Sequence, residues 1–75
     1  MESRYPRQER LIEVLHERHI SQRELAEMIG MQLPLLSRKL NGHRQISVDE
    51  ALRIAEALGG TVEELFVGGA VLWKM

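Results

Sequence analysis

The chain contains no cysteine, and this absence removes several kinds of chemistry at once. Disulfide bonds, cysteine-based zinc sites and thiol nucleophiles are excluded, and a cysteine-free chain fits a reducing compartment. No apolar run approaches the roughly 18 residues that a membrane span needs. The charged N-terminal stretch 1–10 is not followed by the apolar region of a signal peptide. We therefore expect a cytoplasmic protein with no membrane segment.

Aromatic residues and enzyme motifs are scarce as well. One Trp, one Tyr and one Phe occur in 75 residues, so aliphatic side chains must fill the core of a single small domain. His16 and His19 could share a metal ion, but no Cys and no third nearby ligand accompany them. Ser37 is not set in a Gly-x-Ser-x-Gly turn, and phosphate loops and paired carboxylates in a cleft are missing. We expect no catalytic residue, no cofactor, no metal and no enzyme activity.

The formal net charge is only −1, yet the acidic residues are unevenly distributed. Residues 29–47 contain no Asp or Glu, and the same stretch holds Arg38, Lys39, His43 and Arg44. A slightly acidic chain can therefore present one basic surface of the kind that nucleic acids bind. Elsewhere arginines alternate with glutamates in the way that a solvated helix face does, although two of them could still reach phosphates. The alternating arginines are Arg7, Arg10, Arg18 and Arg23, and the two that could reach phosphates are Arg10 and Arg23.

Three segments begin with the same local signal for the start of a helix. Ser21, Ser47 and Thr61 are each followed three residues later by a glutamate. In such a capping box the hydroxyl accepts a hydrogen bond from the backbone of the glutamate, whose carboxylate reaches back to the amide of the capping residue. Apolar residues at helical spacing follow each box, so a helix is expected after each of them.

We predict an all-α fold of five helices, since no segment alternates long enough between apolar and polar residues to form a sheet. The expected ranges are 6–19, 21–29, 33–40, 48–58 and 62–66. Pro6 suits a first helical position, Pro34 is tolerated in a first turn, and Gly30 supplies a left-handed stop. The side chains expected on the inner faces are Leu11, Ile12 and Leu15 in the first helix, Leu25, Met28 and Ile29 in the second, and Ala51, Leu52, Ala55 and Leu58 in the fourth.

Residues 21–41 describe two short helices joined by a tight turn. Gly30 begins the turn, and Ala26 lies on the inner face of the first helix, where a larger side chain would push the two helices apart. The second helix is then rigidly held with its outer face exposed. A helix presented in this way fits the major groove of B-DNA, which is about 12 Å wide.

The order and spacing of these residues resemble the lambda-repressor-like helix-turn-helix domains of the Cro/CI or XRE type. The resemblance covers residues 10–66 and is carried by Ser21–Glu27, Gly30-Met31, Leu36–Arg38, Asn41-Gly42, Ala51–Gly59 and Glu64–Phe66. It implies a five-helix fold. We interpret residues 1–75 as one domain, with a core at 7–66 and an apolar C-terminal tail at 67–75.

The resemblance also implies which residues contact DNA. Gln22 matches a family glutamine that contacts phosphate and braces the recognition helix. Gln32 matches the polar residue at the N-terminus of that helix, where backbone amides favour a phosphate. The expected DNA-binding residues are Gln22, Arg23 and Gln32, the base-facing Leu33, Pro34, Ser37 and Arg38, and the flanking Lys39, Asn41, His43 and Arg44.

Two departures from the family change what the helix at 33–40 can read. Leu33 and Pro34 stand where family members usually carry polar residues, so reading there would be apolar, for instance against a thymine methyl group. Ser37 and Arg38 remain as the polar readers, and Arg38 can bind a guanine through two hydrogen bonds.

The function that the resemblance implies is a sequence-specific transcriptional regulator located on the nucleoid. We interpret it as a repressor that binds a palindromic operator as a homodimer, with the helix at 33–40 in the major groove. The tail offers a dimerisation surface, or else Trp73 covers the core of its own protomer. The candidate dimerisation residues are Val67, Val71, Leu72 and Trp73.

An alternative function stays open at this point. Lys39 replaces an apolar core residue of the family, and residues 40–47 are closer to the antitoxin-type branch. The chain would then be an antitoxin or another protein-interaction module with the same fold, and its main partner would be a toxin.

Overall fold

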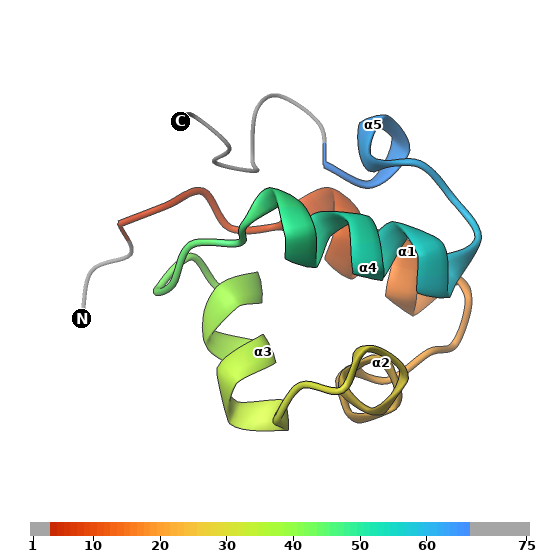
Figure 1. Cartoon of the computed structure of the whole chain (residues 1–75), viewed down its shortest axis with the longest axis horizontal. Coiled ribbons are helices and arrows are strands. Elements are labelled where there is room, and N and C mark those ends of the chain that lie inside the picture. The colour runs from red at the N-terminus through yellow and green to blue at the C-terminus, as the bar shows by residue number, and fades with distance from the viewer. Residues whose placement is uncertain (1–3, 67–75) are drawn as a thin grey trace.

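The computed structural model describes residues 4–66, and this part of the chain is folded into five helices without a strand. The helices are α1 (Glu9–Glu17), α2 (Gln22–Ile29), α3 (Leu33–Leu40), α4 (Val48–Leu58) and α5 (Val62–Leu65). As Figure 1 shows, α2 and α3 lie together on one side of the molecule and α5 lies on the other. Helix α2 packs against α3 and α4, whereas α1 packs against α3 and α5. The all-α class that the sequence predicts is confirmed.

The three predicted capping boxes are present. Ser21, Ser47 and Thr61 precede α2, α4 and α5, and in each box both reciprocal hydrogen bonds are formed. Gly30 and Gly59 end α2 and α4 in the left-handed conformation, with φ of 71° and 69°. Because these signals act within a few residues, the predicted range of α4 agrees with the structure. The predicted range of α3 agrees as well, although this helix has neither a capping box nor a left-handed residue at its C-cap.

The prediction for the first helix is wrong at its start. Pro6 is not a helical residue, and α1 begins only at Glu9. Residues 4–8, which we call the N-terminal arm, run beside the end of α3 instead. The backbone N–H groups of Arg4 and Tyr5 donate to the carbonyl of Gly42 at 3.1 and 3.0 Å. The N–H of Gln8 donates to the carbonyl of Leu40 at 2.8 Å, so these amides serve tertiary contacts rather than a helix.

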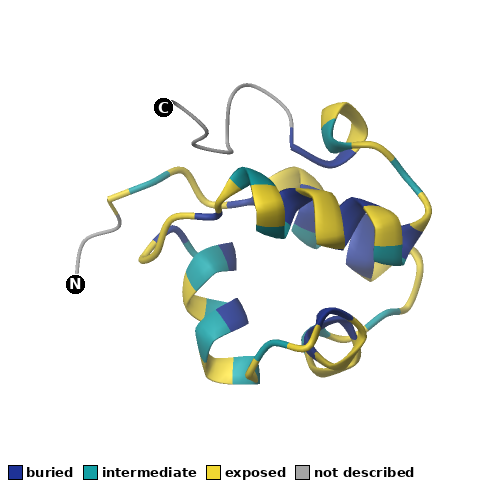
Figure 2. Cartoon of the chain, viewed as in Figure 1, coloured by how far each residue is buried: buried dark blue, intermediate teal, exposed yellow. Residues whose placement is uncertain are grey.

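All five helices contribute to one apolar core. Its fully enclosed side chains are Leu11, Leu25, Leu36, Leu40, Ile46, Ile54 and Leu65. Figure 2 shows the buried positions of each helix facing the interior and the exposed positions facing outward. Two residues that helical spacing places on the inner faces lie outside it, because Met28 is 50% exposed and Leu52 is 54% exposed. The prediction that these two side chains are buried is wrong.

The predicted dimerisation residues Val67, Val71, Leu72 and Trp73 lie outside the described residues. Within residues 4–66, no helix has the length and apolar character that crossing a membrane requires. The same part of the chain holds no group of three or more His, Asp or Glu side chains placed to bind a metal ion.

Candidate nucleic-acid interface

Helix α3 has one buried face and one open face. Leu36 and Leu40 are fully buried, which fixes the helix on the core. Pro34 and Arg38 are exposed on the opposite side. Leu33 is partly buried against the core, so its side chain is less accessible than the exposed side chain of Pro34. The helix therefore presents a narrow exposed face, which we call the outer strip and which includes Pro34 and Arg38, while its inner face is held against the core.

The connection between α2 and α3 has the predicted geometry. Gly30 adopts φ +71°, and the N–H of Met31 donates to the carbonyl of Ala26 at 2.9 Å, which closes the end of α2. Ala26 is 2% exposed, so the side chain buried at this position is a single methyl group. Met31 packs partly buried against the core and leads directly to the start of α3. Such a turn holds α3 at a fixed angle to α2.

The N-terminus of α3 differs from those of α2, α4 and α5 in having no side-chain cap. Gln32 stands at the capping position in an extended conformation and is exposed, and no acidic residue occurs in the first turn. The first-turn amides of a helix have no partner within the helix, and its N-terminus carries a partial positive charge. An anion such as a phosphate can therefore bind this end of α3 without displacing a carboxylate.

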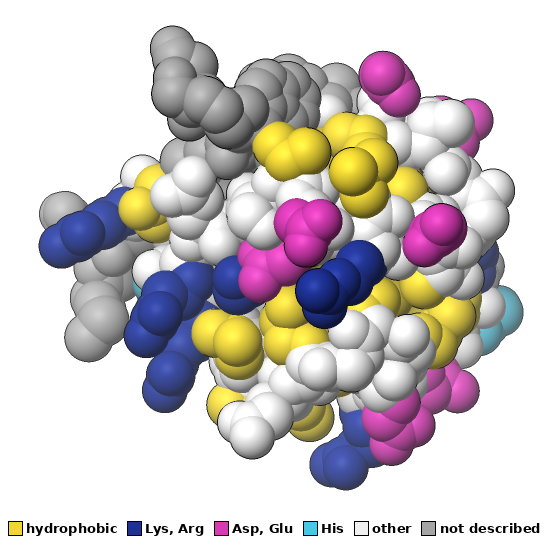
Figure 3. Space-filling view, viewed as in Figure 1, with side chains coloured by type: hydrophobic (Ala, Val, Ile, Leu, Met, Phe, Trp, Pro, Cys, Tyr) yellow, Lys and Arg dark blue, Asp and Glu magenta, His cyan; other side chains and the backbone are white. Residues whose placement is uncertain are grey.

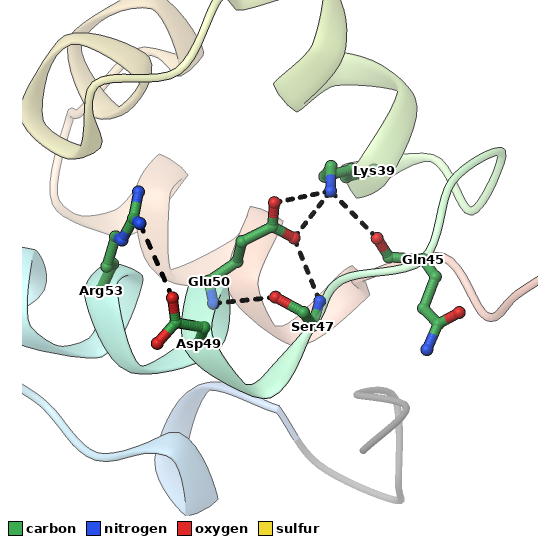
Figure 4. A network of polar contacts seen from close by, with 6 residues as sticks. All are labelled: Lys39, Gln45, Ser47, Asp49, Glu50 and Arg53. Carbon is green, nitrogen blue, oxygen red and sulfur yellow. Dashed lines mark hydrogen bonds and ion pairs between the residues drawn. The ribbon is translucent and has the colours of Figure 1, made fainter. Parts of the chain in front are cut away.

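Lys39 is the expected contact residue whose setting differs most from the prediction. Its ammonium group binds both carboxylate oxygens of Glu50, at 2.6 and 2.8 Å, and donates to the carbonyl of Gln45 at 3.1 Å. The two side chains are only 12% and 22% exposed. Figure 4 shows that the same carboxylate also accepts from the backbone of Ser47, completing the capping box of α4. Lys39 thus joins the last turn of α3 to the first turn of α4.

This contact changes the acidity of Glu50. Burial by itself would raise the pKa of the carboxyl group, but the hydrogen bonds from Lys39 and Ser47 and the positive charge of Lys39 outweigh it and lower the pKa below its ordinary value. The carboxyl group of Glu50 is therefore ionised at neutral pH.

The loop after α3 folds back on the helix it leaves. The Asn41 side chain donates from Nδ2 to the carbonyl of Ser37 at 2.9 Å, and its Oδ1 accepts from Nε of Arg7 at 3.3 Å. The N–H of His43 donates to the carbonyl of Arg38 at 2.9 Å. Gly42 is buried with φ +85°, a conformation that favours glycine. His43 and Arg44 are exposed in this loop.

The predicted DNA-binding residues differ in their exposure and in their partners. Those on or beside the outer strip of α3 and exposed to solvent are Gln32, Pro34, Arg38, His43 and Arg44. Those that are partly buried are Gln22 on α2 and Leu33, Ser37 and Asn41 on or after α3, while Arg23 is exposed on α2. Lys39 alone is bound in an ion pair. Arg10, which the sequence left open as a phosphate contact, donates to Glu13 and to the carbonyl of Glu64 and so points toward α5.

Charge is distributed in the way that this arrangement suggests. Figure 3 shows Lys and Arg side chains gathered on the side of the molecule that α3 and the following loop occupy. Most Asp and Glu side chains in the same view lie over α2, α4 and α5. The sequence did not identify the N-terminal arm as part of this surface, because only long-range hydrogen bonds place it there.

The comparisons with known proteins agree with this geometry. The helix-turn-helix family model matches residues 7–65. Two uncharacterized HTH-type transcriptional regulators, from the CDC 1551 and H37Rv strains of Mycobacterium tuberculosis, are each 41% identical over 54 residues. This alignment covers 72% of the chain but only 39% of each relative, so the chain spans about two fifths of the length of these proteins. No solved structure gives a significant match.

Proposed function

The chain belongs to the helix-turn-helix family, and we propose that it is a DNA-binding transcriptional regulator that inserts α3 into the major groove. One observation carries the proposal. Helix α3 is anchored by the fully buried Leu36 and Leu40, and its opposite face exposes Arg38. The helix lies within residues 29–47, a stretch of the chain that contains no acidic residue. A rigidly held helix with a basic outer strip is what the major groove accepts.

Each residue on this surface has a chemical role in the proposal. Arg38 reads base edges and has the geometry to bind guanine O6 and N7 together, with Ser37 beside it as a second hydrogen-bonding group. Pro34, and to a smaller extent Leu33, can contact only apolar groups such as thymine methyls. Gln32 and the uncapped start of α3 bind one phosphate. Gln22 and Arg23 on α2, together with Asn41, His43 and Arg44 in the loop, contact or support contacts to the flanking backbone.

Lys39 has a different role in this proposal from the one that the sequence suggested. Because its ammonium group is bound to Glu50 at 2.6 Å, we assign it to holding the end of α3 rather than to binding phosphate. The prediction that it contacts DNA directly stays untested.

The regulator is proposed to act as a repressor on a palindromic operator. A single domain of this type buries only roughly 600–1,000 Å² on DNA, which favours a two-fold dimer on half-sites about 34 Å apart. The apolar residues of the tail, Val67, Val71, Leu72 and Trp73, are the proposed dimerisation surface. We place the protein in the cytoplasm, on the nucleoid.

Selection of bound sequences from a random DNA library tests this function directly. We expect an enriched motif with two-fold symmetry, and on the selected site Arg38→Ala should reduce affinity by about 1–3 kcal/mol and relax the preference at one base pair. Arg53→Ala is the matched control, since Arg53 is an exposed arginine on α4 that faces Asp49. Equal losses in both variants, or no enrichment at all, would contradict the proposal.

A second candidate is the protein-interaction module of antitoxin type. The observation that favours it is the exposure of Met28 and Leu52, two large apolar side chains outside the proposed DNA surface. Binding that falls steeply with salt separates the two functions, because each phosphate contact contributes a slope of about −0.9 in log affinity against log salt.

A further inference from the structure

The N-terminal arm is fixed to the proposed DNA surface by several contacts. The carbonyl of Gly42 accepts from the N–H groups of both Arg4 and Tyr5, and the carbonyl of Leu40 accepts from that of Gln8. The side chain of Arg7 adds a bond from Nε to Oδ1 of Asn41 at 3.3 Å. In Figure 1 the arm lies beside the loop that joins α3 to α4. These contacts place residues 4–8 next to the loop that flanks the outer strip of α3.

The arm brings positive charge to this edge and no negative charge. Arg4 and Arg7 are both exposed, residues 4–8 contain no acid, and the acids that flank the arm along the chain are Glu2 and Glu9. The bond to Asn41 uses one donor of the Arg7 guanidinium, which carries five N–H groups. The other donors of Arg7 are available to an acceptor outside the protein.

Position and charge together suggest what the arm does. His43 and Arg44 are exposed in the same loop whose Gly42 carbonyl holds the arm. The arm and the loop therefore form one continuous basic edge at the C-terminal end of α3. A cation that is held in place before binding loses less conformational freedom on meeting a phosphate than one on a free segment.

We propose that the N-terminal arm is a second phosphate-binding element, in which Arg4 and Arg7 bind the DNA backbone next to the phosphates contacted by His43 and Arg44. The inference rests on the proposed DNA-binding function and extends its footprint beyond the helix-turn-helix. The arm binds phosphates of any sequence, so it raises affinity and fixes the position of α3 without reading bases.

Asn41 has a corresponding role as a positioning residue. Its amide spans from the carbonyl of Ser37 in the last turn of α3 to Arg7 in the arm. The arm and the recognition helix are therefore linked through one side chain, which keeps Arg7 at a fixed place relative to α3.

Salt-dependent binding of the full chain to a random-sequence 30-base-pair duplex tests the proposal, because non-specific affinity comes almost entirely from phosphate contacts. The double variant Arg4→Gln/Arg7→Gln is compared with Arg18→Gln/Arg53→Gln, which removes the same charge from other surfaces. In the native chain Arg18 donates to the carbonyl of Leu58, and Arg53 faces Asp49. Thermal unfolding of each variant shows that it is folded.

We expect the arm variant to reduce the slope of log affinity against log salt by about one to two, and to lower affinity by roughly tenfold per lost contact at ~0.1 M salt. The control variant should keep the native slope. Arg7→Lys should also keep the slope, because it retains the charge and loses only the geometry of the bond to Asn41. Loss of slope in Arg7→Lys would mean that Arg7 acts only as a strut and would overturn its role as a phosphate ligand.

Different results would refute the role of the arm and the proposed DNA-binding function. A native slope in Arg4→Gln/Arg7→Gln, or equal slopes in the arm and control variants, would refute the arm while leaving DNA binding intact. Absence of salt-dependent binding by the unaltered chain would refute the proposed function itself.

Discussion

The starts of α3 and α4 lie at the two ends of the same acid-free stretch, but they are built in opposite ways. Helix α4 begins with Ser47 and Glu50 in a complete capping box, and its first turn carries two acids. Helix α3 begins at Gln32 with no side-chain cap and no acid. A capped helix start already has its own carboxylate beside it, whereas an uncapped start without an acid can accept an external anion. Comparing the two shows which helix end is available for a ligand.

The capping boxes are themselves unequal. The box of α2 is formed by Ser21 and Glu24, which are both exposed. In the box of α4, Glu50 also binds Lys39 from the last turn of α3. The same local motif therefore serves only its own helix in α2, while in α4 it also binds the last turn of α3.

Removing Glu50 should have the largest effect on stability. Glu50→Ala loses the reciprocal bond to Ser47 and leaves the 12%-exposed side chain of Lys39 without its carboxylate. We expect a loss of about 2–3 kcal/mol in the free energy of unfolding, measured in urea. Glu24→Ala, in the exposed box, should cost at most about 1 kcal/mol. Equal losses in the two variants would show that the contact with Lys39 adds nothing.

Acid should weaken the joint between α3 and α4 in the native chain. The pKa of Glu50 is lowered in the folded state, so the unfolded chain binds the proton first as the pH falls. The stability from this group is complete above the ordinary glutamate pKa and is lost as the pH drops through the lowered value. Melting temperatures between pH 7 and pH 3 should fall less in Glu50→Gln than in the native chain, and parallel curves would contradict the assignment.

Adding a capping residue to α3 should make its start resemble the capped start of α4. Gln32→Asp supplies an acceptor for the first-turn amides and should stabilise the domain by about 0.5–1 kcal/mol. The new charge occupies the proposed phosphate position, so DNA affinity should fall by roughly tenfold, as a gel-shift titration would measure. Gln32→Ser is the uncharged control, which should gain stability with a smaller loss of binding. An undiminished affinity in Gln32→Asp would place the phosphate elsewhere.

The smallest effects are expected at the two exposed apolar residues. Leu52→Gln and Met28→Gln replace side chains that are 54% and 50% exposed, so stability should change by only about 0.5 kcal/mol or less. DNA affinity should not change, because neither residue belongs to the proposed interface. A change in the mass of the particle in solution would instead assign this surface to protein contacts.

Sequence reasoning succeeded where the determining contacts are local. A capping box acts over three residues and a left-handed glycine acts at one position, so the sequence predicts α4 with the bounds that the structure has. The turn at Gly30 with the small Ala26 is likewise readable from spacing. These features also identify the outer face of α3 as the candidate site.

Sequence reasoning failed where contacts join distant parts of the chain. The start of α1 is delayed because backbone amides of residues 4–8 bind carbonyls at Leu40 and Gly42. The partner of Lys39 is eleven residues away, on another helix. Helical spacing shows which face of a helix is apolar but not how much of that face is buried. Leu52 is therefore predicted in the core, although it lies outside the core in the structure. No local pattern in the sequence carries this information.

The division of α3 into a buried row and an exposed row also has an evolutionary consequence. Leu36 and Leu40 carry the packing of the helix, while Pro34 and Arg38 contribute little to the core. Substitutions in the exposed row can thus accumulate without unfolding the domain, and under the proposed function such substitutions would change the operator preference. The same separation makes a library at positions 34, 37 and 38 a practical test of whether this face of α3 sets the DNA sequence that the domain prefers.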